Sequence, residues 1–466
     1  MDKKKLLLIS YHFPPDSAVG GLRAAKFARF LPESGFDTFV LTIKERYLEK
    51  PDPKRLKDVE GIKTFRTMEL PTVRTTYLGL KRLLRPNLDI SEFVQAGPVS
   101  VSSPGGALTG REGLKRRLKR YFLSLFISLP DDQRKWVIPA AVRAVIEIRR
   151  RGITHIMTSS PPHSVQLIGL VVKRLTGVFW VADFRDPWVE TIECKPPSVR
   201  SSLSERIERW LENKTMRNAD RVVTTTESFR RSLLERYPRL PAEKFVYIPN
   251  GIDTSQFADR TATEKYETFT ITYTGTIYEG RTPEPVFEAI RGLIRDGMIK
   301  RSEIRVRLVG HCGNICGKDT SSVIKSYGMD DIVEVLRPVP YPDALAMLRR
   351  SHLLLLLAPS QPLAVPAKVY DYLGAGTDII ALTEEGATSD LIRETGSGRC
   401  FTHNDIEGIG RYILETMQNR DGGSKTDDFK DRSRFDIRVL AKKLADELSS
   451  AGPPLGTGSI ELKNGI

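Results

Sequence analysis

The residues best suited to chemistry lie in the stretch VPAKVYDYLGAGTDIIAL, from Val365 to Leu382. Pro366 favours a helix start, because the first turn does not use the amide hydrogen that proline lacks. Lys368, Asp371 and Tyr372 then fall on one face of that helix. A helix that starts at a cleft presents free N–H groups and a positive dipole end, which suit an anion. The pattern indicates either a ligand with phosphate at one end and sugar at the other, or an ordinary capped amphipathic helix.

A glycine pair follows the first predicted strand, where open α/β sheets bind ligands. In PPDSAVGGLR, Gly20 and Gly21 have no β-carbon, so the backbone could approach a ligand just before a helix begins. The spacing is not that of a GxGxxG dinucleotide fingerprint. The stretch therefore predicts either a phosphate or sugar contact or an ordinary strand-to-helix turn.

Two further polar stretches follow predicted strands in the first half of the chain. His163, in SSPPHS, is expected at a helix start, which favours a neutral imidazole able to donate or accept a hydrogen bond. A structural histidine is the alternative. In DFRDPW, Asp183 and Asp186 flank Arg185. They could form an internal salt bridge or a polar wall for an acceptor, with Trp188 offering an apolar face to a sugar ring.

In the second half, YTGTIYEGR combines a glycine and a basic residue at a strand end. Gly275 ends the predicted strand, and the planar guanidinium of Arg281 could reach a diphosphate. Upstream, IPNGID at residues 248–253 contains an Asn-Gly turn, where we expect the chain to cross between its two halves.

Strands and helices that alternate along the whole chain must position these residues. Strands are predicted at residues 5–10, 36–43, 153–158, 178–182, 221–226, 245–249, 269–274, 303–309, 332–336, 352–357 and 378–382. Helices are predicted at 22–34, 163–175, 204–217 and 435–449, the third with Ile207, Trp210 and Leu211 on one side. This is an α/β pattern of two Rossmann-like domains that face across a cleft.

The expected organisation has five parts. They are an N-terminal domain at 1–250 with a mobile insertion at about 87–110, a linker at 251–268, a C-terminal domain at 269–432, a closing helix at 433–450, and a disordered tail at 451–466.

The net charge of +14 over 466 residues requires a negative partner: nucleic acid, an anionic lipid surface or a phosphorylated substrate. Residues 111–120 hold six basic residues and one acidic residue and precede an apolar run at 121–129. This segment predicts either a helix in an anionic membrane interface or a surface helix packed on the core. No aromatic-interleaved basic motif indicates specific nucleic-acid binding, and no stretch is long and apolar enough to span a bilayer.

Four cysteines in so long a chain do not make a disulfide framework, which favours the reducing cytosol. His311, Cys312 and Cys316 lie close together, but the second ligand pair of a zinc site is missing, so no metal is expected.

Together these stretches resemble the GT-B glycosyltransferases, specifically the large retaining family 4, from the first strand to about residue 440. IPNGID followed by Phe257 resembles that family's inter-domain signature. YTGTIYEGR resembles its donor-diphosphate element, PAKVYDYLGAG its nucleotide-sugar motif, and DFRDPW a loop of bacterial envelope-polysaccharide members. The chain departs from the family at Leu363 and Asp371, where two glutamates are frequent, and at Thr276, where an arginine is usual.

The resemblance implies transfer of a sugar, with retention and without a metal or cofactor, from a nucleotide-diphosphate sugar to a lipid-linked or polysaccharide acceptor in envelope or exopolysaccharide biosynthesis. With the cysteine content and the basic segment at 111–120, it predicts a cytoplasmic protein, peripheral on the inner face of the membrane. The implied donor residues are Gly275, Thr276, Arg281, Lys368, Val369, Asp371 and Tyr372. The implied acceptor or cleft residues are Gly20, Gly21, Arg23, Asp183, Arg185 and Asp186, and the candidate catalytic residues are His163, Arg281 and Lys368. A sugar-nucleotide epimerase-like enzyme and a catalytically degenerate binding subunit are the alternatives.

Overall fold

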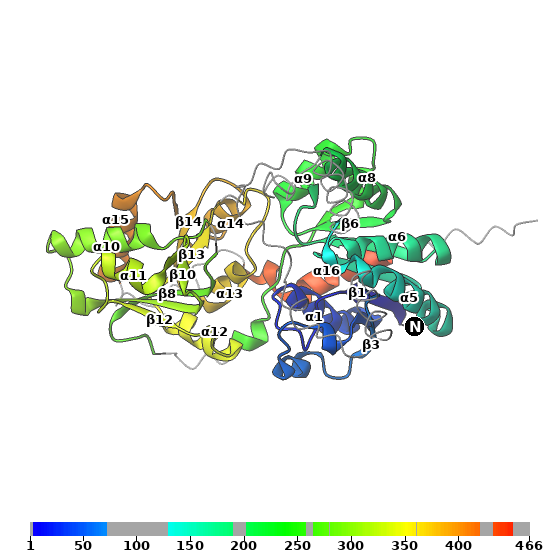
Figure 1. The fold of residues 1–466 in the computed structure, drawn as a ribbon, viewed down its shortest axis with the longest axis horizontal. Helices are drawn as coiled ribbons and strands as arrows, with labels where there is room; N and C mark the ends of the chain where they lie inside the picture. Colours follow the sequence, from blue (N-terminus) through cyan, green and yellow to red (C-terminus); the bar gives the residue numbers. More distant parts are fainter. Residues whose placement is uncertain are drawn as a thin grey trace, which may run out of the picture.

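Two parallel sheets, each flanked by helices, form the two halves of the molecule (Figure 1). The computed structural model describes residues 3–71, 129–189, 202–257, 264–278, 280–359, 361–419 and 432–450. The predicted mobile insertion at 87–110, the basic segment at 111–120 and the tail at 451–466 lie outside these ranges. The α/β class with two Rossmann-like sheets is confirmed.

The first sheet has the order β3-β2-β1-β4-β5-β6-β7 and the second the order β12-β9-β8-β13-β14-β15 among the described residues. The first sheet consists of β1 (Lys4–Ser10), β2 (Phe36–Ile43), β3 (Lys63–Thr67), β4 (His155–Ser160), β5 (Phe179–Phe184), β6 (Arg221–Thr224) and β7 (Phe245–Tyr247). The second consists of β8 (Phe269–Thr276), β9 (Ile304–His311), β12 (Val333–Leu336), β13 (Leu353–Ala358), β14 (Ile379–Thr383) and β15 (Gly398–Phe401). A short antiparallel pair, β10 (Asn314–Ile315) and β11 (Lys318–Asp319), lies outside both sheets.

Helices cover both sheets. The first half holds α1 (Gly20–Phe30), α5 (Val137–Arg151), α6 (Ser164–Thr176), α8 (Ser202–Asn218) and α9 (Glu227–Arg236). The second holds α10 (Glu284–Arg295), α11 (Thr320–Ser326), α12 (Tyr341–Arg350), α13 (Lys368–Ala375), α14 (Ala387–Thr395) and α15 (Ile406–Gln418), and α16 (Ile437–Ser449) ends the described chain. Every predicted strand is present within two residues at either end, whereas the edge strands β3 (KTFRT) and β15 (GRCF), which are not continuous apolar runs, were not predicted.

Two predicted helices differ from the observed ones. The helix expected at 22–34 ends as an α-helix at Phe30 and tightens into a 3-10 turn at Leu31–Ser34, which contains Pro32. In α8 the predicted apolar side is only partly inward: Leu211 packs against the core, but Trp210 is 58% exposed, while Glu208 and Glu212 are buried. Glu212 turns inward because it accepts hydrogen bonds from the Val189 amide and from other polar groups around it.

The chain crosses between the two sheets twice, and the two crossings pair. After β7 it passes through Ile252, whose amide donates to the Phe435 carbonyl at 2.7 Å, while the Ile437 amide donates to the Ile252 carbonyl at 2.9 Å. Helix α16 then lies back on the first half (Figure 1), where its apolar side joins the same buried cluster as α1. Within the described ranges, no helix has the length and hydropathy needed to cross a bilayer.

Candidate functional site

Helix α13 carries the residues singled out from the sequence, and buried contacts fix its position. The Tyr372 hydroxyl accepts from the Thr274 amide at 3.2 Å and donates to the Leu355 carbonyl at 3.1 Å, which ties the helix to β8 and β13. Val369 is fully buried in the same apolar cluster. Val369 and Tyr372 therefore hold the helix in place, which differs from the expectation that their side chains contact a donor. Gly376, with φ of 71°, ends the helix.

Lys368 occupies the first turn of α13 with its ammonium buried and without a hydrogen-bond partner among the described residues. The Lys368 Nζ atom lies 4.0 Å from the centroid of the Tyr273 ring. Burial, and after it the nearby charge of Arg281, lower the pKa of Lys368 to about 7. Because an unpaired buried cation is costly, this group is suited to an incoming anion.

Gly275 and Arg281 complete the surroundings of that ammonium. A β-carbon at Gly275 would lie 2.7 Å from the Lys368 Nζ atom, so glycine leaves the space that the lysine uses. The Arg281 side chain is buried, and its guanidinium carbon lies 3.9 Å from the centroid of the Tyr278 ring. Neither Arg281 nor Lys368 has a carboxylate within 4.0 Å in the described part of the chain. Two adjacent cations without a counter-ion among the described residues are suited to an anion. Thr276 is exposed beside it.

Asp371 lies one turn further along α13 and is oriented by a residue that the sequence did not indicate. The Tyr341 hydroxyl donates to Asp371 Oδ1 at 2.7 Å. Burial raises the pKa of Asp371, while the charge of Lys26, which comes from α1 in the first half, opposes this shift. Asp371 thus lies where the two halves meet. A tyrosine at a helix start carries no local signal of this role.

Arg23 and Asp183 form a buried clamp, which corrects the expectation that they line an acceptor site. The Arg23 guanidinium donates to Asp183 Oδ1 at 3.0 Å and to the carbonyls of Ile248 and Pro249 at 2.9 and 2.6 Å. Ser159 Oγ donates to the same carboxylate at 2.7 Å. Since both charges are buried, the pair joins α1, β5 and the first crossing segment, and neither side chain is available to a ligand.

Arg185 is likewise engaged with the protein. It donates to the carbonyls of Gly20, Ser160 and Pro161, and so ties the end of β5 to the start of α1. A β-carbon at Gly20 would lie 2.9 Å from an Arg185 nitrogen, so the glycine admits this guanidinium. Asp186 is exposed to solvent, and partial desolvation by the nearby protein raises the pKa of its carboxyl group.

At Gly21 a β-carbon would lie 3.2 Å from the backbone of His12, so this glycine permits a close approach within the protein. That histidine is not among the residues that the sequence indicated. His12 Nδ1 lies 2.7 Å from Asp16 Oδ2 beside the same glycine turn. Burial alone would raise the pKa of Asp16, but hydrogen bonds from His12 and the Ala18 amide outweigh it and lower the pKa. The spacing HFPPD could have indicated the pair.

His163 precedes α6, as expected, and stacks on Trp188 with ring centroids 5.0 Å apart and an interplanar angle of 6°. The expectation that Trp188 offers its face to a sugar is wrong, because the ring is 1% exposed. The N-terminus of α6 is also occupied: Asp131 Oδ2 accepts from the Ser164 amide at 2.8 Å. Burial raises the pKa of Asp131. The N-terminus of α6 is therefore already capped by a carboxyl group of the protein.

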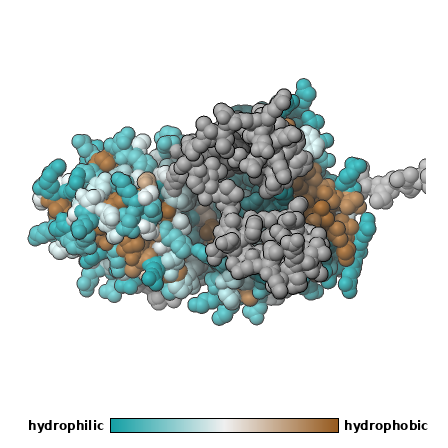
Figure 2. All heavy atoms as spheres, viewed as in Figure 1, coloured by the Kyte–Doolittle hydropathy of each residue, from teal (hydrophilic) through white to brown (hydrophobic). Residues whose placement is uncertain are grey.

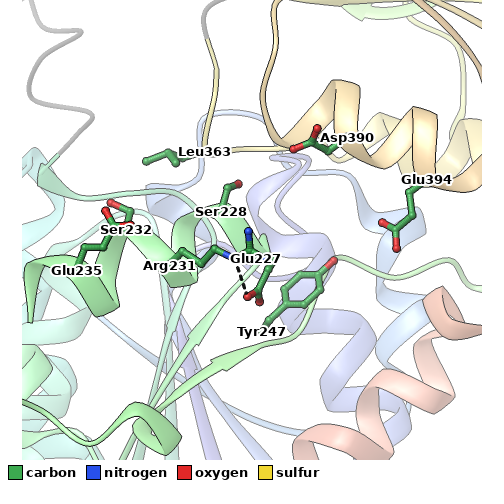
Figure 3. A pocket seen from close by; sticks show the side chains of 9 residues that line it. All are labelled: Glu227, Ser228, Arg231, Ser232, Glu235, Tyr247, Leu363, Asp390 and Glu394. Carbon is green, nitrogen blue, oxygen red and sulfur yellow. Dashed lines mark hydrogen bonds and ion pairs between the residues drawn. The ribbon is translucent and has the colours of Figure 1, made fainter. Parts of the chain in front are cut away.

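A cavity of about 870 Å³ lies between the two halves, beside α9 and α14. Figure 3 shows Asp390 and Glu394 of α14 facing residues of α9 across it, with Leu363 at its edge. The remaining lining residues are Glu227, Ser228, Arg231, Ser232, Glu235 and Tyr247. Four carboxylates and one arginine make this space unfavourable for phosphate, so it is distinct from the Lys368 anion site. Thr226 Oγ1 donates to the Leu363 carbonyl at 2.6 Å and links the two halves there.

In the described ranges no group of three or more histidine, cysteine, aspartate or glutamate side chains is arranged to hold a metal ion.

Comparisons with known proteins agree with this architecture. Residues 20–251 match the family model described as "Glycosyl transferase 4-like domain". A D-inositol 3-phosphate glycosyltransferase from Kineococcus radiotolerans is 27% identical over 139 residues, which are 28% of this chain and 32% of that protein. The match thus spans about a third of the length of this curated relative.

Solved structures resemble the chain over nearly its whole length. A glycosyltransferase from Rickettsia africae has a TM-score of 0.59 at 12% identity, covering 97% of this chain and all of that one. Anabaena HepE, solved with UDP and glucose, has a TM-score of 0.59 at 13% identity, covering 96% and 100%. WaaG, described as a glycosyltransferase involved in lipopolysaccharide biosynthesis, has a TM-score of 0.55 at 12% identity, with coverage of 96% and 100%. The chain therefore has the GT-B fold of these glycosyltransferases, and its residues 20–251 form a glycosyl transferase 4-like domain.

Proposed function

We propose that this protein transfers a sugar, with retention and without a metal ion, from a nucleotide-diphosphate sugar to a lipid-linked or polysaccharide acceptor of envelope or exopolysaccharide biosynthesis. The observation that carries the proposal is the Lys368 ammonium, which is buried, has no hydrogen-bond partner in the described part of the chain and lies next to Arg281 at the start of α13. HepE, a structural neighbour, was solved with UDP-glucose. We place the donor diphosphate of this chain at the start of α13.

The proposed chemistry follows from charge. Breaking the sugar–phosphate bond leaves negative charge on the diphosphate while the sugar becomes oxocarbenium-like. Lys368, Arg281 and the N-terminal dipole of α13 stabilise this leaving group more than the ground state, which is the condition for catalysis. These fixed cations take the part that a divalent metal plays in other transferases. Asp371, oriented by Tyr341, is placed to accept from ribose or sugar hydroxyls.

The acceptor belongs on the N-terminal side of the cleft. His163 and Asp186 lie beyond the ends of β4 and β5, where open α/β sheets bind ligands. With Asp183 and Arg23 engaged in the buried clamp, His12 and Asp186 are the better candidates for contact with an acceptor hydroxyl. The resemblance to WaaG, a glycosyltransferase involved in lipopolysaccharide biosynthesis, supports an envelope acceptor at the cytoplasmic face of the membrane.

The test is hydrolysis and transfer with a panel of UDP-, GDP- and ADP-sugars. Lys368→Ala and Arg281→Ala should each reduce kcat by about 10²–10³-fold, the range for removing one preorganised donor to developing charge. Lys325→Ala and Arg411→Ala are matched controls, because both side chains are exposed in the same half of the molecule. If calorimetry detects no binding of any nucleotide sugar to the wild type, the proposal fails.

Two alternatives give different products. An epimerase-like enzyme would convert one nucleotide sugar into another without an acceptor. A degenerate binding subunit, for which Leu363 in place of the frequent glutamate is the best support, would bind the donor without turnover. Product analysis by mass spectrometry separates both from a transferase.

A further inference from the structure

A strip of exposed aliphatic side chains runs along the outer side of α5. Ile138, Val142 and Ile146 follow one another at intervals of four residues and are 62, 56 and 51% exposed. On the neighbouring helix α6, Val171 and Leu175 have the same spacing and are 40 and 56% exposed. The two helices pack side by side, so these five residues form one surface, the aliphatic face. Figure 2 shows hydrophobic atoms gathered at the end of the molecule where Figure 1 places α5 and α6.

The acidic charge beside this surface is neutralised within the protein. Helices α5 and α6 carry a single carboxylate, Glu147, which is buried and paired with Arg143 at 2.8 Å and Arg151 at 2.6 Å. Lys173 on α6 is paired with Asp220 at 2.6 Å. No negative side chain on either helix is thus left facing solvent.

Three arginines on the same two helices have no ion pair among the described residues. Arg149 and Arg150 continue the α5 strip one turn beyond Ile146, and Arg174 adjoins Leu175 on α6. All three are exposed. The aliphatic face is therefore bordered by unpaired positive charge, on a chain whose net charge is +14.

We infer that the aliphatic face and Arg149, Arg150 and Arg174 dock this protein on the surface of an anionic lipid bilayer. An apolar helix side flanked by basic residues binds in the plane of such an interface, with its side chains in the acyl boundary and its cations at the headgroups. A second copy of the chain fits less well, because meeting through this face would bring the same arginines together.

The location of the face is compatible with catalysis. In a parallel sheet the flanking helices run opposite to the strands, so the C-terminal ends of α5 and α6 lie at the edge of the sheet away from the cleft. A membrane bound there leaves the Lys368 site accessible from solution. The inference goes beyond the proposed function and does not depend on the donor chemistry.

The test is co-sedimentation of the full chain with vesicles of phosphatidylcholine, with and without phosphatidylglycerol. The wild type should bind the anionic vesicles, and more weakly as salt rises. Arg149→Glu, Arg150→Glu and Arg174→Glu combined should weaken binding at least 100-fold, since each cation near an anionic surface contributes about fivefold. Ile138→Ser, Val142→Ser and Ile146→Ser combined should weaken it at least tenfold. Met298→Ser and Arg411→Glu, both at exposed positions in the other half, should have no effect.

Three results would overturn the inference: equal binding to neutral vesicles, unchanged binding of both combined variants, or loss of binding only when Arg116, Arg117, Lys119 and Arg120 are neutralised. Concentration-dependent dimerisation that the serine variant abolishes would instead assign the face to a second copy. Circular dichroism shows whether each variant is folded. Lys368→Ala should lose turnover and keep vesicle binding, which separates this inference from the proposed function.

Discussion

Binding of a nucleotide sugar should take up a proton at Lys368. In the free protein, burial and Arg281 lower the pKa of Lys368 to about 7. A bound diphosphate restores the charged form by pairing with it. Below pH 7 the ammonium is already charged, so binding takes up no proton. Above pH 7 the lysine must be protonated on binding, so affinity falls as pH rises.

The size of the effect follows from the geometry. A phosphate oxygen about 4 Å from the Lys368 Nζ atom interacts by ~4 kcal/mol at an effective dielectric constant of 20. At about 1.4 kcal/mol per pKa unit, this raises the pKa of Lys368 by ~3 units in the complex. The apparent Kd should then rise about 25-fold between pH 6.5 and pH 8.5, because proton uptake costs up to tenfold per pH unit in this range.

Isothermal titration calorimetry in two buffers of different ionisation enthalpy measures the proton uptake directly. A nucleotide sugar is the suitable ligand, because its diphosphate ester does not titrate between these pH values. We expect an uptake of about 0.9 protons at pH 8 and close to zero at pH 6. Lys368→Met should bind weakly and without proton uptake. Uptake that persists in this variant, or none in the wild type, would refute the reasoning.

Three further changes have defined outcomes. Gly275→Ala should displace the Lys368 ammonium and lower kcat/KM at least tenfold, whereas Gly297→Ala, which also has a positive φ but open space around it, should leave activity unchanged. Arg23→Met leaves the Asp183 carboxylate buried without its cation and should lower the free energy of unfolding by about 3–5 kcal/mol in urea denaturation; a loss below 1 kcal/mol would contradict the clamp. Tyr341→Phe should raise KM for the nucleotide sugar several-fold with little change in stability, and an unaltered KM would show that Asp371 needs no orientation.

Most of the fold could be predicted because most strands and helices have a recognisable apolar pattern in their own residues. The central strand β13 is an apolar run that the sheet buries on both faces, LLLLLA at Leu353–Ala358, whereas the edge strands β3 (KTFRT) and β15 (GRCF) have no such run and are absent from the prediction. The error in α8 has a specific cause. Hydrophobicity placed Trp210 inward, but a carboxylate can be buried when it accepts enough hydrogen bonds, and Glu212 does so with partners from other segments. The spacing of apolar residues along a helix does not reveal such partners.

The kind of candidate site could be predicted from the sequence, but the contacts within it could not. A lysine after a helix-starting proline and an arginine after a strand indicated an anion site. That Lys368 is unpartnered, and that Gly275 provides its space, depends on a close approach between β8 and α13. The prediction from DFRDPW was wrong because it also depended on a contact between distant segments. Asp183 pairs with Arg23, which is distant in sequence, and not with the nearby Arg185. Spacing shows which charges are near along the chain and not which are buried together.

The return of α16 to the first half has a consequence for synthesis of the chain. Its residues Ile437, Leu440 and Leu444 cover the apolar side of α1, which includes Phe27. As the polypeptide leaves the ribosome, this patch stays exposed to solvent until the whole second half has been synthesised. We expect a nascent chain halted before α16 to expose the patch to chaperones, and a fragment ending near residue 251 to aggregate unless the final helix is supplied in trans.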